Sequence, residues 1–491
     1  MFTHTHQSKK WPWVILMSIL VLIGLFFFAY HQLTKQGIRA VWDSPFVQEK
    51  ITQEVPTEYQ GLILFVPTLL GFDAPKTYVV LFQNNTEIRP GGGFIGSYAT
   101  IEVSGGIPHV LTVEGTERLD RKTPDSWKPV PPRILTQELK VDRWYFRDSN
   151  WDIDFETNAK RALEFYTQEG GIAAEKIDGV IGVDTHVIEA LLEITGPVTV
   201  QGIEFDAKNV VEKLEYEVEY GFVQKQIPFE NRKQIMTPLL HEIIGKIKGD
   251  LLLHPQKYIG LMETLAKEKH VFVYMTDESL QTSLRSSGVA GIHEPYTTDV
   301  LLWADANLAA LKTDHAIERV LAYSIQKQEQ GAWSHRATMT YTHTGTFDWR
   351  TSRYRTYARV FVPKDASLVA VYATDKNGNT KPIPLTAVTQ EIVGMYQTFG
   401  TLFIIEPKDE RSLTFEYRFP HAWYTNILAK KYYELLLPKQ HGTRAHGLTL
   451  SLDFGTTITG ATPAEAQEEW GNSVYTYTTD LRIDRDVAIQ F

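Results

Sequence analysis

Cysteine is missing from all 491 residues of this chain. Its absence excludes disulfides, thiolate zinc sites, iron–sulfur clusters and a cysteine nucleophile. A chain without thiols suits an oxidising compartment outside the cytoplasm, but the absence alone leaves the redox compartment open.

A surplus of positive charge is missing too. The chain has 49 Lys and Arg residues against 59 Asp and Glu residues, which gives a formal net charge of -10 at pH 7. Because a nucleic-acid-binding surface must neutralise phosphates, this balance argues against nucleic acid as a partner. The apolar fraction of 43% is that of a globular protein, and the length suggests two or three domains.

The common catalytic motifs are also absent. The chain has no G-x-S-x-G elbow and no P-loop, and "HEIIG" at 241–245 lacks the second histidine of H-E-x-x-H. Its fifteen histidines show no ligand spacing, so we interpret them as surface or packing residues and predict no metal site. Asp148, Asp152 and Asp154 could offer oxygen ligands to Ca²⁺ or Mg²⁺. Asp154 stands just before a predicted helix, however, where capping is the simpler role.

One long apolar run is present near the start of the chain. Residues 11–30, "WPWVILMSILVLIGLFFFAY", contain Ser18 as the only clearly polar residue. At about 1.5 Å rise per residue, this helix would span about 30 Å, the thickness of a bilayer core. Trp11, Trp13 and Tyr30 stand where an aromatic belt is expected. We predict an uncleaved transmembrane anchor; a signal peptide, with its usual core of about 7–15 residues, is the alternative.

The charges that flank this run do not decide its orientation. Lys9 and Lys10 precede it, and Lys35 and Arg39 follow it, so the positive-inside count is a tie. We expect residues 1–10 to be a cytoplasmic tail, residues 31–58 to be a stalk, and the remaining chain to lie outside the cell membrane. No later segment approaches a second span.

The remaining chain is predicted to contain two domains. In residues 59–300, the first strands are predicted at 77–84, 94–103 and 107–115, with a hairpin turn at Gly105–Gly106 between the last two. Strands and helices then alternate, including a helix capped by Asp277, which predicts a mixed α/β domain with some parallel pairing. Within it, residues 116–150 are proline-containing and are interpreted as a loop. In residues 301–491, apolar runs bounded by turns recur with little helix, which predicts a mostly β, sandwich-like domain.

The most unusual stretch is "LFQNNTEIRPGGGFIGSYATIEVSGG", residues 81–106. Glycines let backbone N–H groups converge on an anion, and Arg89 could bind a phosphate or carboxylate through both ends of its guanidinium. A phosphate loop normally opens a helix, whereas a strand follows here. From the residues alone we therefore favour a turn or bulge in which Asn84, Asn85 and Glu87 satisfy backbone groups.

This stretch resembles the signature of bacterial proteins classified as domain of unknown function 4012. Further blocks follow in the same order: "FRDSNWDIDF", "IDGVIGVDTHVIEALLEITGPVTV", "ADANLAALKTDHAIER", "YRTYARVFVPKDA" and "LTFEYRFP". The resemblance covers roughly residues 75–420. It implies a membrane anchor with the bulk of the chain outside, and it implies no established activity.

A weaker resemblance is to the LytR-CpsA-Psr phosphotransferases, which attach polyprenyl-diphosphate-linked glycopolymers to the bacterial cell wall. It rests on "LFQNNTEIR", "DGVIGVDTHVIEALLEITGPVTV" and "NRKQIMTPLLHEIIGKI". It implies that Asn85, Arg89 and Arg232 face a diphosphate. The chain departs from this family in two ways: "LEYEVEYGFVQKQ" lacks the expected paired arginines, and the acid for Mg²⁺ is replaced by Asn85 or displaced to Glu87. Because a diphosphate needs several cations and Mg²⁺ needs carboxylates, these departures favour binding without transfer.

We therefore expect a single-pass, membrane-anchored, extracytoplasmic protein of the bacterial cell envelope that binds an envelope glycan or lipid-linked polymer without catalysis. Its expected partners are the lipid bilayer, through residues 11–30, and a glycopolymer or polyprenyl-phosphate lipid. One alternative is a divergent glycopolymer phosphotransferase, with Mg²⁺ as a cofactor in that case only; another is a purely structural surface protein. The candidate ligand-binding residues are Asn85, Glu87, Arg89, Gly91, Gly92, Gly93, Arg147, Asp148 and Arg232.

Overall fold

The computed structural model describes residues 37–45, 48–49, 65–251, 254–293, 295–327 and 333–491. The predicted tail and the predicted anchor, residues 1–30, lie outside the described residues, as does most of the predicted stalk. Among the residues described, no helix has both the length and the apolar character needed to cross a bilayer.

The chain divides into two compact units. The smaller unit comprises the described residues up to Tyr78 together with Ile101–Leu111, and the larger unit comprises Val79–Thr100 and Thr112–Phe491. The predicted domain boundary between residues 300 and 301 falls inside the larger unit and stays a prediction.

The smaller unit contains two short helices and the tip of a hairpin. The helices are α2 (Gly37–Trp42) and α5 (Val66–Leu69). At the tip, Gly105 and Gly106 have φ values of 57° and 81°, the left-handed conformation that a Gly-Gly turn requires. The predicted hairpin turn is therefore confirmed.

A five-stranded sheet carries the unusual glycine-rich stretch. Its strands are β1 (Lys76–Asn84), β2 (Phe94–Ser104), β3 (Ile107–Gly115), β4 (Ile177–Asp184) and β7 (Val271–Met275). Their order is β3-β2-β1-β4-β7, and β4 pairs with β7 in the antiparallel sense. The predicted strands at 77–84, 94–103 and 107–115 are confirmed.

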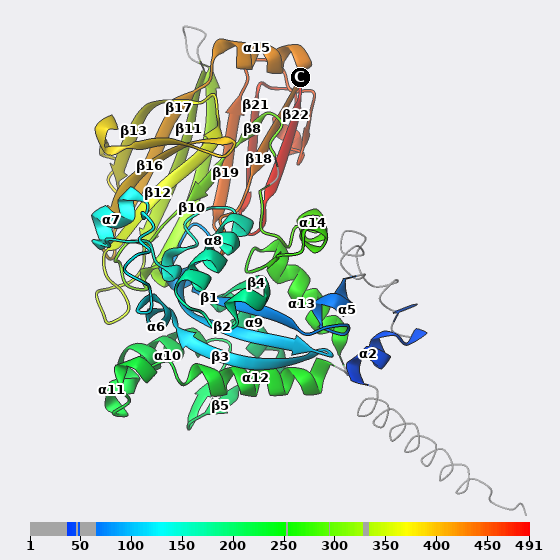
Figure 1. The fold of residues 1–491 in the computed structure, drawn as a ribbon. Helices are drawn as coiled ribbons and strands as arrows, with labels where there is room; N and C mark the ends of the chain where they lie inside the picture. Colours follow the sequence, from blue (N-terminus) through cyan, green and yellow to red (C-terminus); the bar gives the residue numbers. More distant parts are fainter. Residues whose placement is uncertain (1–36, 46–47, 50–64, 252–253, 294, 328–332) are drawn as a thin grey trace, which may run out of the picture. The chain divides into compact units, whose positions relative to one another are not determined.

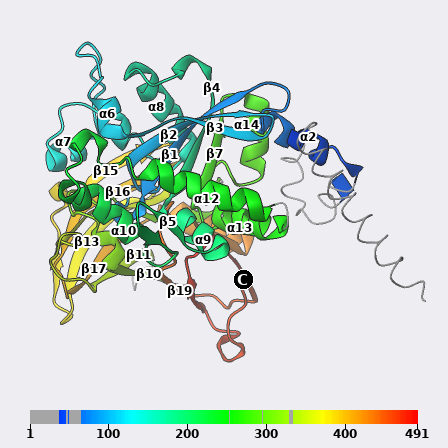
Figure 2. The same cartoon turned by 90° about the horizontal axis from the view of Figure 1, so that it is seen from below.

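Helix α8 (Phe155–Gln168) covers this sheet within the larger unit (Figures 1 and 2). Its first turn is capped by Asp154, whose carboxylate accepts a hydrogen bond from the Thr157 N–H at 2.7 Å, as the sequence predicted. Phe155, Ala159 and the rest of its apolar face pack against buried side chains of the sheet. The predicted helix at this position is confirmed.

A second apolar cluster of the larger unit is built from α9, α10, α12 and the β5–β6 hairpin. The bounds of these elements and of their neighbours along the chain are α9 (Thr185–Thr195), β5 (Val198–Val200), β6 (Ile203–Phe205), α10 (Val210–Tyr216), the π-helical segment η4 (Glu217–Gly221), α11 (Phe222–Gln224), α12 (Met236–Leu251), α13 (Pro255–Lys267) and α14 (Glu278–Ser286).

The interpretation of residues 116–150 as a loop is wrong in part. This segment contains α6 (Thr116–Asp120) and α7 (Arg133–Leu139). The four prolines of the segment lie between these two helices, and Pro132 stands at the cap of α7, where its missing N–H costs no helical hydrogen bond.

After residue 298 the described chain is rich in strands, as predicted. The bounds are β8 (Asp299–Val300), β9 (Leu302–Ala304), β10 (Ile317–Lys327), β11 (Trp333–His343), β12 (Tyr354–Pro363), β13 (Ser367–Asp375), β14 (Thr380–Pro382), β15 (Thr389–Val393), β16 (Tyr396–Ile405), β17 (Glu410–Arg418), α15 (His421–Lys430), β18 (Tyr432–Leu437), β19 (Gly447–Asp453), β20 (Gly460–Thr462), β21 (Val474–Asp480) and β22 (Arg485–Gln490).

These strands form three sheets that share one large apolar core. The sheet orders are β14-β13-β17-β11-β10-β19-β21, β15-β16-β12-β9 and β20-β22-β18-β8. Leu321, Tyr341 and Phe415 are examples of the fully buried side chains of this core. The chain is thus a mixed α/β protein with many sheets.

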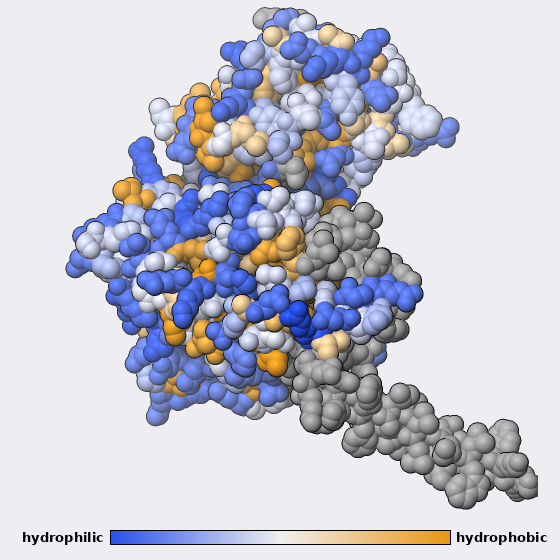
Figure 3. Space-filling model, turned by 45° about the vertical axis from the view of Figure 1, so that its right-hand side comes forward, coloured by the Kyte–Doolittle hydropathy of each residue, from blue (hydrophilic) through white to orange (hydrophobic). Residues whose placement is uncertain are grey.

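One face of the surface is drawn in Figure 3. Hydrophilic side chains prevail on it, and apolar side chains gather in small patches. Small scattered apolar patches are normal on a soluble surface, so only a patch with a specific arrangement of side chains indicates binding.

Candidate functional site

The glycine-rich motif lies between two neighbouring strands. We call residues 84–93 the signature loop. After β1, Asn85–Glu87 form one turn of 3₁₀ helix, and the Asn84 Oδ1 atom accepts hydrogen bonds from the Thr86 N–H at 3.0 Å and the Thr86 hydroxyl at 2.7 Å. The loop is therefore a compact turn held by its own side chains.

The glycine triplet allows close packing around this turn. A Cβ atom on Gly91 would lie 2.3 Å from the Asn158 Nδ2 atom, and one on Gly93 would lie 2.4 Å from the Asn84 carbonyl carbon. Gly92 has a φ of +128°, which side-chain-bearing residues rarely adopt. All three positions thus require glycine for reasons of space or backbone conformation.

Two N–H groups of the triplet are already used inside the chain. The Gly91 N–H donates to the Asn150 carbonyl oxygen at 3.1 Å, and the Gly92 N–H donates to the Arg89 carbonyl oxygen at 3.0 Å. These two groups do not point together at a common anion position.

Arg89 and Arg147 meet at a shared carboxylate. Arg89 is only 2% exposed, and its Nε atom lies 3.7 Å from the Asp148 Oδ1 atom. Arg147 Nε lies 3.7 Å from the Asp148 Oδ2 atom, and its guanidinium also contacts Asp120 at 3.3 Å. Glu87 approaches the other end of Arg89 at 3.4 Å. The structure therefore brings four of the candidate residues together in an alternating row of charges.

Arg232 joins this row through a different acid. Its NH2 atom lies 3.3 Å from the Glu117 Oε1 atom, and Lys233 Nζ lies 2.8 Å from Glu117 Oε2. Glu117 and Asp120 are both on α6, so this short helix links Arg232 to the row that contains Arg147 and Arg89. Each of the three candidate arginines has a carboxylate partner within the chain.

Burial perturbs the acids of this row. It raises the pKa of Asp120 and that of the neighbouring Glu169, whose pKa is raised further by the negative charge of Asp120. Burial also raises the pKa of Glu87, although the positive charge of Arg89 opposes this effect. Within the described residues, Arg89 Nε and Asp148 Oδ1 have no hydrogen-bond partner.

Asn85 contacts a separate group of residues. Its Nδ2 atom donates to the Gly442 carbonyl oxygen at 2.9 Å and lies 3.4 Å from the Asp184 Oδ2 atom. The Thr185 hydroxyl donates to the Asn85 Oδ1 atom. Asp184 Oδ2 also lies 2.6 Å from the His270 Nδ1 atom, so Asn85 stands beside a buried aspartate–histidine pair.

A cluster of three possible metal ligands surrounds this histidine. His186, Glu268 and His270, which we call the His–carboxylate cluster, place one ligand atom each within 4.8 Å of the others. Burial lowers the pKa of His270, although Asp184 opposes this effect, so the imidazole is neutral at pH 7. The buried Lys439 donates from Nζ to the Glu268 carbonyl oxygen.

Sequence reasoning missed this cluster because its members come from separate elements. His186 lies in the first turn of α9, whereas Glu268 and His270 lie in the turn between α13 and β7. A local signal does exist: an acid stands two residues before each histidine, in "DTH" at 184–186 and in "EKH" at 268–270.

A late segment of the chain also holds the signature loop. Gln440 donates from Nε2 to the Arg89 carbonyl oxygen at 3.1 Å, and the backbone of His441 forms a bridge with that of Gly91. Sequence reasoning did not include residues 439–443, because they lie beyond the stretch that carries the resemblance.

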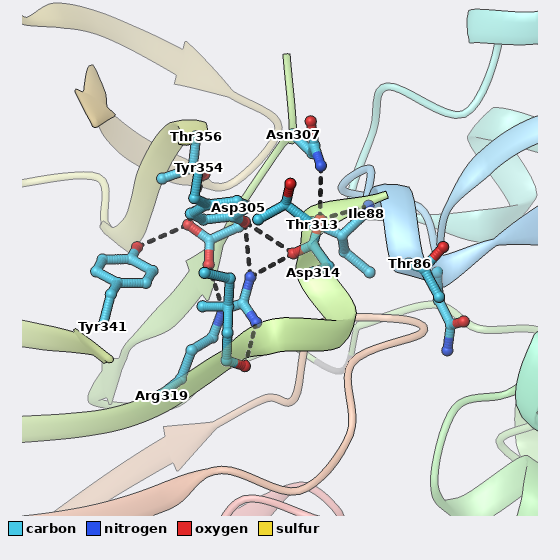
Figure 4. A network of polar contacts seen from close by, with 12 residues as sticks. Thr86, Ile88, Asp305, Asn307, Thr313, Asp314, Arg319, Tyr341, Tyr354 and Thr356 are labelled. Atoms are coloured by element: carbon cyan, nitrogen blue, oxygen red, sulfur yellow. Dashed lines mark hydrogen bonds and ion pairs between the residues drawn. The ribbon is translucent and has the colours of Figure 1, made fainter. Parts of the chain in front are cut away.

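A buried ionic network fixes the loop from the side of β10. Figure 4 shows Arg319 between Asp305 and Asp314, at 2.8 and 2.6 Å. Asp314 also accepts hydrogen bonds from the Tyr354 hydroxyl at 2.8 Å and from the Ile88 N–H at 3.1 Å. The block "ADANLAALKTDHAIER" therefore supplies residues that hold the signature loop in place.

A partly exposed group of aromatic rings lies beside the same loop. Tyr216, Tyr220 and Trp349, which we call the aromatic platform, contact one another: the tyrosine rings are 6.0 Å apart and inclined by 24°, and the Trp349 ring meets both edge-on at 5.6 Å. Tyr220 is 45% exposed. Tyr216 caps the π-helical segment η4 and Tyr220 lies within it; this kind of distortion is frequent at functional sites.

Glu215 connects this platform to the signature loop. Its Oε1 atom accepts hydrogen bonds from the Thr86 hydroxyl at 2.5 Å and from Asn84 Nδ2 at 2.9 Å. Its Oε2 atom accepts a hydrogen bond at 2.6 Å from the Nε atom of Arg350, the residue after Trp349. The buried carboxylate thus fixes both chain segments that present the aromatic rings.

Residues 73–218 match a family whose description reads "Protein of unknown function (DUF4012)". None of the curated proteins compared with the chain matches it. The matched segment contains every candidate residue except Arg232.

Several solved structures are similar over part of the chain. A putative nutrient binding protein from Legionella pneumophila is 8% identical, with a TM-score of 0.26, over 39% of this chain and 71% of its own. A putative protease from Parabacteroides distasonis is 11% identical, with a TM-score of 0.22, over 36% and 41%. An M1 zinc metallopeptidase from Deinococcus radiodurans is 10% identical, with a TM-score of 0.17, over 36% and 43%. The chain spans less than half the length of the putative protease and of the metallopeptidase. TM-scores this low do not indicate a shared fold.

Proposed function

We propose that this chain, whose residues 73–218 belong to the family of proteins of unknown function DUF4012, is a membrane-anchored receptor for an envelope glycan. In this proposal, residues 11–30 anchor it in the cell membrane with residues 1–10 in the cytoplasm. An α/β domain and a β-sandwich-like domain stand outside. The protein binds the glycan, free or as a lipid-linked polymer, and does not transfer it.

The aromatic platform is the observation that carries the proposal. The face of a sugar ring is apolar and can stack on an aromatic face, while its hydroxyl groups hydrogen-bond to polar side chains beside the rings. Ligand sites commonly combine aromatic surfaces with a few fixed polar groups. Tyr220 offers such a surface, and Arg350 and Glu215 are fixed next to it. Exposed aromatic groups with a defined arrangement are typical of binding sites.

The charged row supports binding over transfer. A diphosphate would need positive charge that is free to neutralise it. Arg89, Arg147 and Arg232 are instead paired with carboxylates of the chain. Displacing those carboxylates would leave them buried without partners, which is costly.

Binding to isolated cell-wall sacculi tests the proposal. We expect the full-length chain, in detergent, to co-sediment with sacculi that carry their glycopolymers. The variants Tyr220→Ala and Trp349→Ala should each weaken binding at least about fivefold, because each removes a stacking surface. Trp470→Ala is the matched control: Trp470 is 64% exposed and lies in the segment between β20 and β21. Equal binding by Trp349→Ala and Trp470→Ala, or no binding by the unaltered chain, contradicts the proposal.

A divergent phosphotransferase is the second candidate. One observation favours it: Arg89 and Arg147 converge on Asp148, and Arg89 Nε and Asp148 Oδ1 lack hydrogen-bond partners among the described residues. In that case the chain, given Mg²⁺, a polyprenyl-diphosphate-linked glycan and cell wall as the acceptor, would join the glycan phosphate to a cell-wall hydroxyl and release polyprenyl phosphate. Arg89→Lys would abolish the release. Co-sedimentation without release distinguishes the receptor from the transferase.

A further inference from the structure

We infer that His186, Glu268 and His270 bind one divalent transition-metal ion of the zinc type. Two imidazole nitrogens and one carboxylate oxygen are a donor set used by zinc sites and by other first-row metals, whereas Ca²⁺ and Mg²⁺ prefer oxygen ligands alone. Among the described residues, this is the one group of three such side chains whose ligand atoms lie close enough together. The inference concerns a site separate from the aromatic platform and does not depend on the glycan.

The hydrogen bonds of both histidines leave their Nε2 atoms for the metal. His270 uses Nδ1 for Asp184 Oδ2 at 2.6 Å, and His186 uses Nδ1 for Glu189 Oε2 at 3.0 Å. A histidine that binds a metal through one nitrogen usually hydrogen-bonds a carboxylate or carbonyl group through the other. Both histidines of the cluster have this arrangement.

The buried histidine points at the third ligand. His270 is 2% exposed, and its Nε2 atom lies 3.9 Å from Glu268 Oε2. No hydrogen bond joins this nitrogen to another described residue. An ion between His270 Nε2 and the Glu268 carboxylate would occupy this position.

The spacing requires a small adjustment on binding. With metal–ligand distances of about 2.0–2.2 Å, two ligand atoms of a tetrahedral site are about 3.3–3.6 Å apart. The ligand atoms of the cluster lie within 4.8 Å of one another, so the side chains must approach by up to about 1.5 Å. His186, whose side chain is 34% exposed, has the freedom to make this movement.

The charges around the cluster are compatible with a cation. Arg482 contacts Glu268 Oε1 at 3.6 Å, but its side chain is 57% exposed and can turn into solvent. Arg444 pairs with Glu189 from the exposed side. Lys439 donates to the Glu268 carbonyl oxygen and leaves the Glu268 carboxylate to the metal.

A metal at this position would join separate elements. It would tie the first turn of α9 to the turn between α13 and β7. Asp184, which orients His270, is also within 3.4 Å of Asn85 in the signature loop. The ion would therefore stabilise the part of the larger unit that supports this loop.

Metal binding by the full-length chain in detergent tests the inference. The chain should carry a tag without histidines and the substitutions His4→Ala and His6→Ala, because His4 and His6 in the predicted tail could themselves bind metal. We expect about one Zn²⁺ per chain by elemental analysis after dialysis. Co²⁺ should give the visible absorption bands of a four- or five-coordinate site.

Three variants decide the outcome. His186→Ala and Glu268→Gln should each raise the Kd for Zn²⁺ at least about tenfold and remove the Co²⁺ bands. His254→Ala is the matched control, because exposed His254 also pairs with a nearby carboxylate, that of Asp250, at 2.7 Å. Zn²⁺ should raise the melting temperature of the unaltered chain and of His254→Ala, but not that of His186→Ala. Substoichiometric binding, or the same affinity in His186→Ala and His254→Ala, overturns the inference; circular dichroism shows whether each variant is folded.

Discussion

Consecutive side chains of the signature loop contact different partners. Asn84 and Thr86 both hydrogen-bond to Glu215, the residue before Tyr216 of the aromatic platform, whereas Asn85, between them, contacts Asp184 beside the His–carboxylate cluster. Glu87 then turns toward Arg89. The unusual polar composition of this stretch follows from these contacts: each polar side chain satisfies a different part of the surrounding structure.

The glycine triplet gives the prediction at this scale. Gly93→Ala should lower the free energy of unfolding by about 1–3 kcal/mol, because its Cβ would lie 2.4 Å from the Asn84 carbonyl carbon and backbone must move. Gly96→Ala is the control: its Cβ would meet nothing nearer than a Phe94 ring carbon at 3.8 Å. Urea unfolding followed by circular dichroism measures both. Equal stability of the two variants would show that the loop is not closely packed.

At the scale of secondary-structure elements, the starts of capped helices are the feature that the sequence predicts best. Asp154 and Asp277 cap α8 and α14 as expected, because a cap depends on a residue and the N–H groups two or three positions later. The helices α6 and α7 were missed, since each is short and is held by contacts with distant residues. Lys233, for example, reaches both Glu117 and the Gly96 carbonyl oxygen, and neither contact leaves a local pattern in the sequence.

The link between α8 and α14 gives the prediction for elements. Glu156 in α8 accepts both Nε and NH2 of Arg285 at 2.8 Å, and Lys160 and Gln281 complete its partners. Hydrogen bonds from Arg285 lower the pKa of Glu156 to about 2. Because the folded pKa is below the ordinary value, the stabilisation is complete above about pH 4.5 and is lost as the pH falls from 4.5 toward 2. Glu156→Gln should cost about 1–2 kcal/mol at pH 7, because solvent beside the partly exposed Arg285 screens the ion pair.

The same variant should lose this difference in acid. Denaturant unfolding at pH 7 and pH 3 should show the cost of Glu156→Gln falling by about half at pH 3. Glu278 binds the same Arg285 at 2.6 Å, but its side chain is 74% exposed. Glu278→Gln should therefore change the stability by less than about 0.5 kcal/mol at either pH. A cost of Glu156→Gln that does not depend on pH would contradict the assigned role.

At the scale of the whole molecule, the site depends on contacts that sequence patterns do not report. Asn85 bonds to Gly442, 357 positions away, and Arg89 bonds to Asn307, 218 positions away. Strands and helices could be predicted because their periodicity is local. The candidate residues could be named from their composition, but their charge partners could not, and those partners decide whether an arginine is free for a ligand.

The ionic network of Figure 4 gives the last prediction, on the cooperativity of the larger unit. Asp314 accepts hydrogen bonds from Arg319, Tyr354, Asn307 and the Ile88 N–H, and so joins the strand-rich part to the signature loop. We expect tryptophan fluorescence and circular dichroism to report one coincident unfolding transition for this unit. Asp314→Asn should lower the free energy of unfolding of this unit by about 3–5 kcal/mol, because the buried Arg319 would keep only one carboxylate partner. The substitution would also replace an acceptor oxygen by an amide NH2 group, which would face groups that are themselves hydrogen-bond donors. Asp365→Asn, at an exposed aspartate, should leave the free energy of unfolding unchanged. Separate transitions in the unaltered chain, or equal stability of the two variants, would mean that the network does not couple the parts.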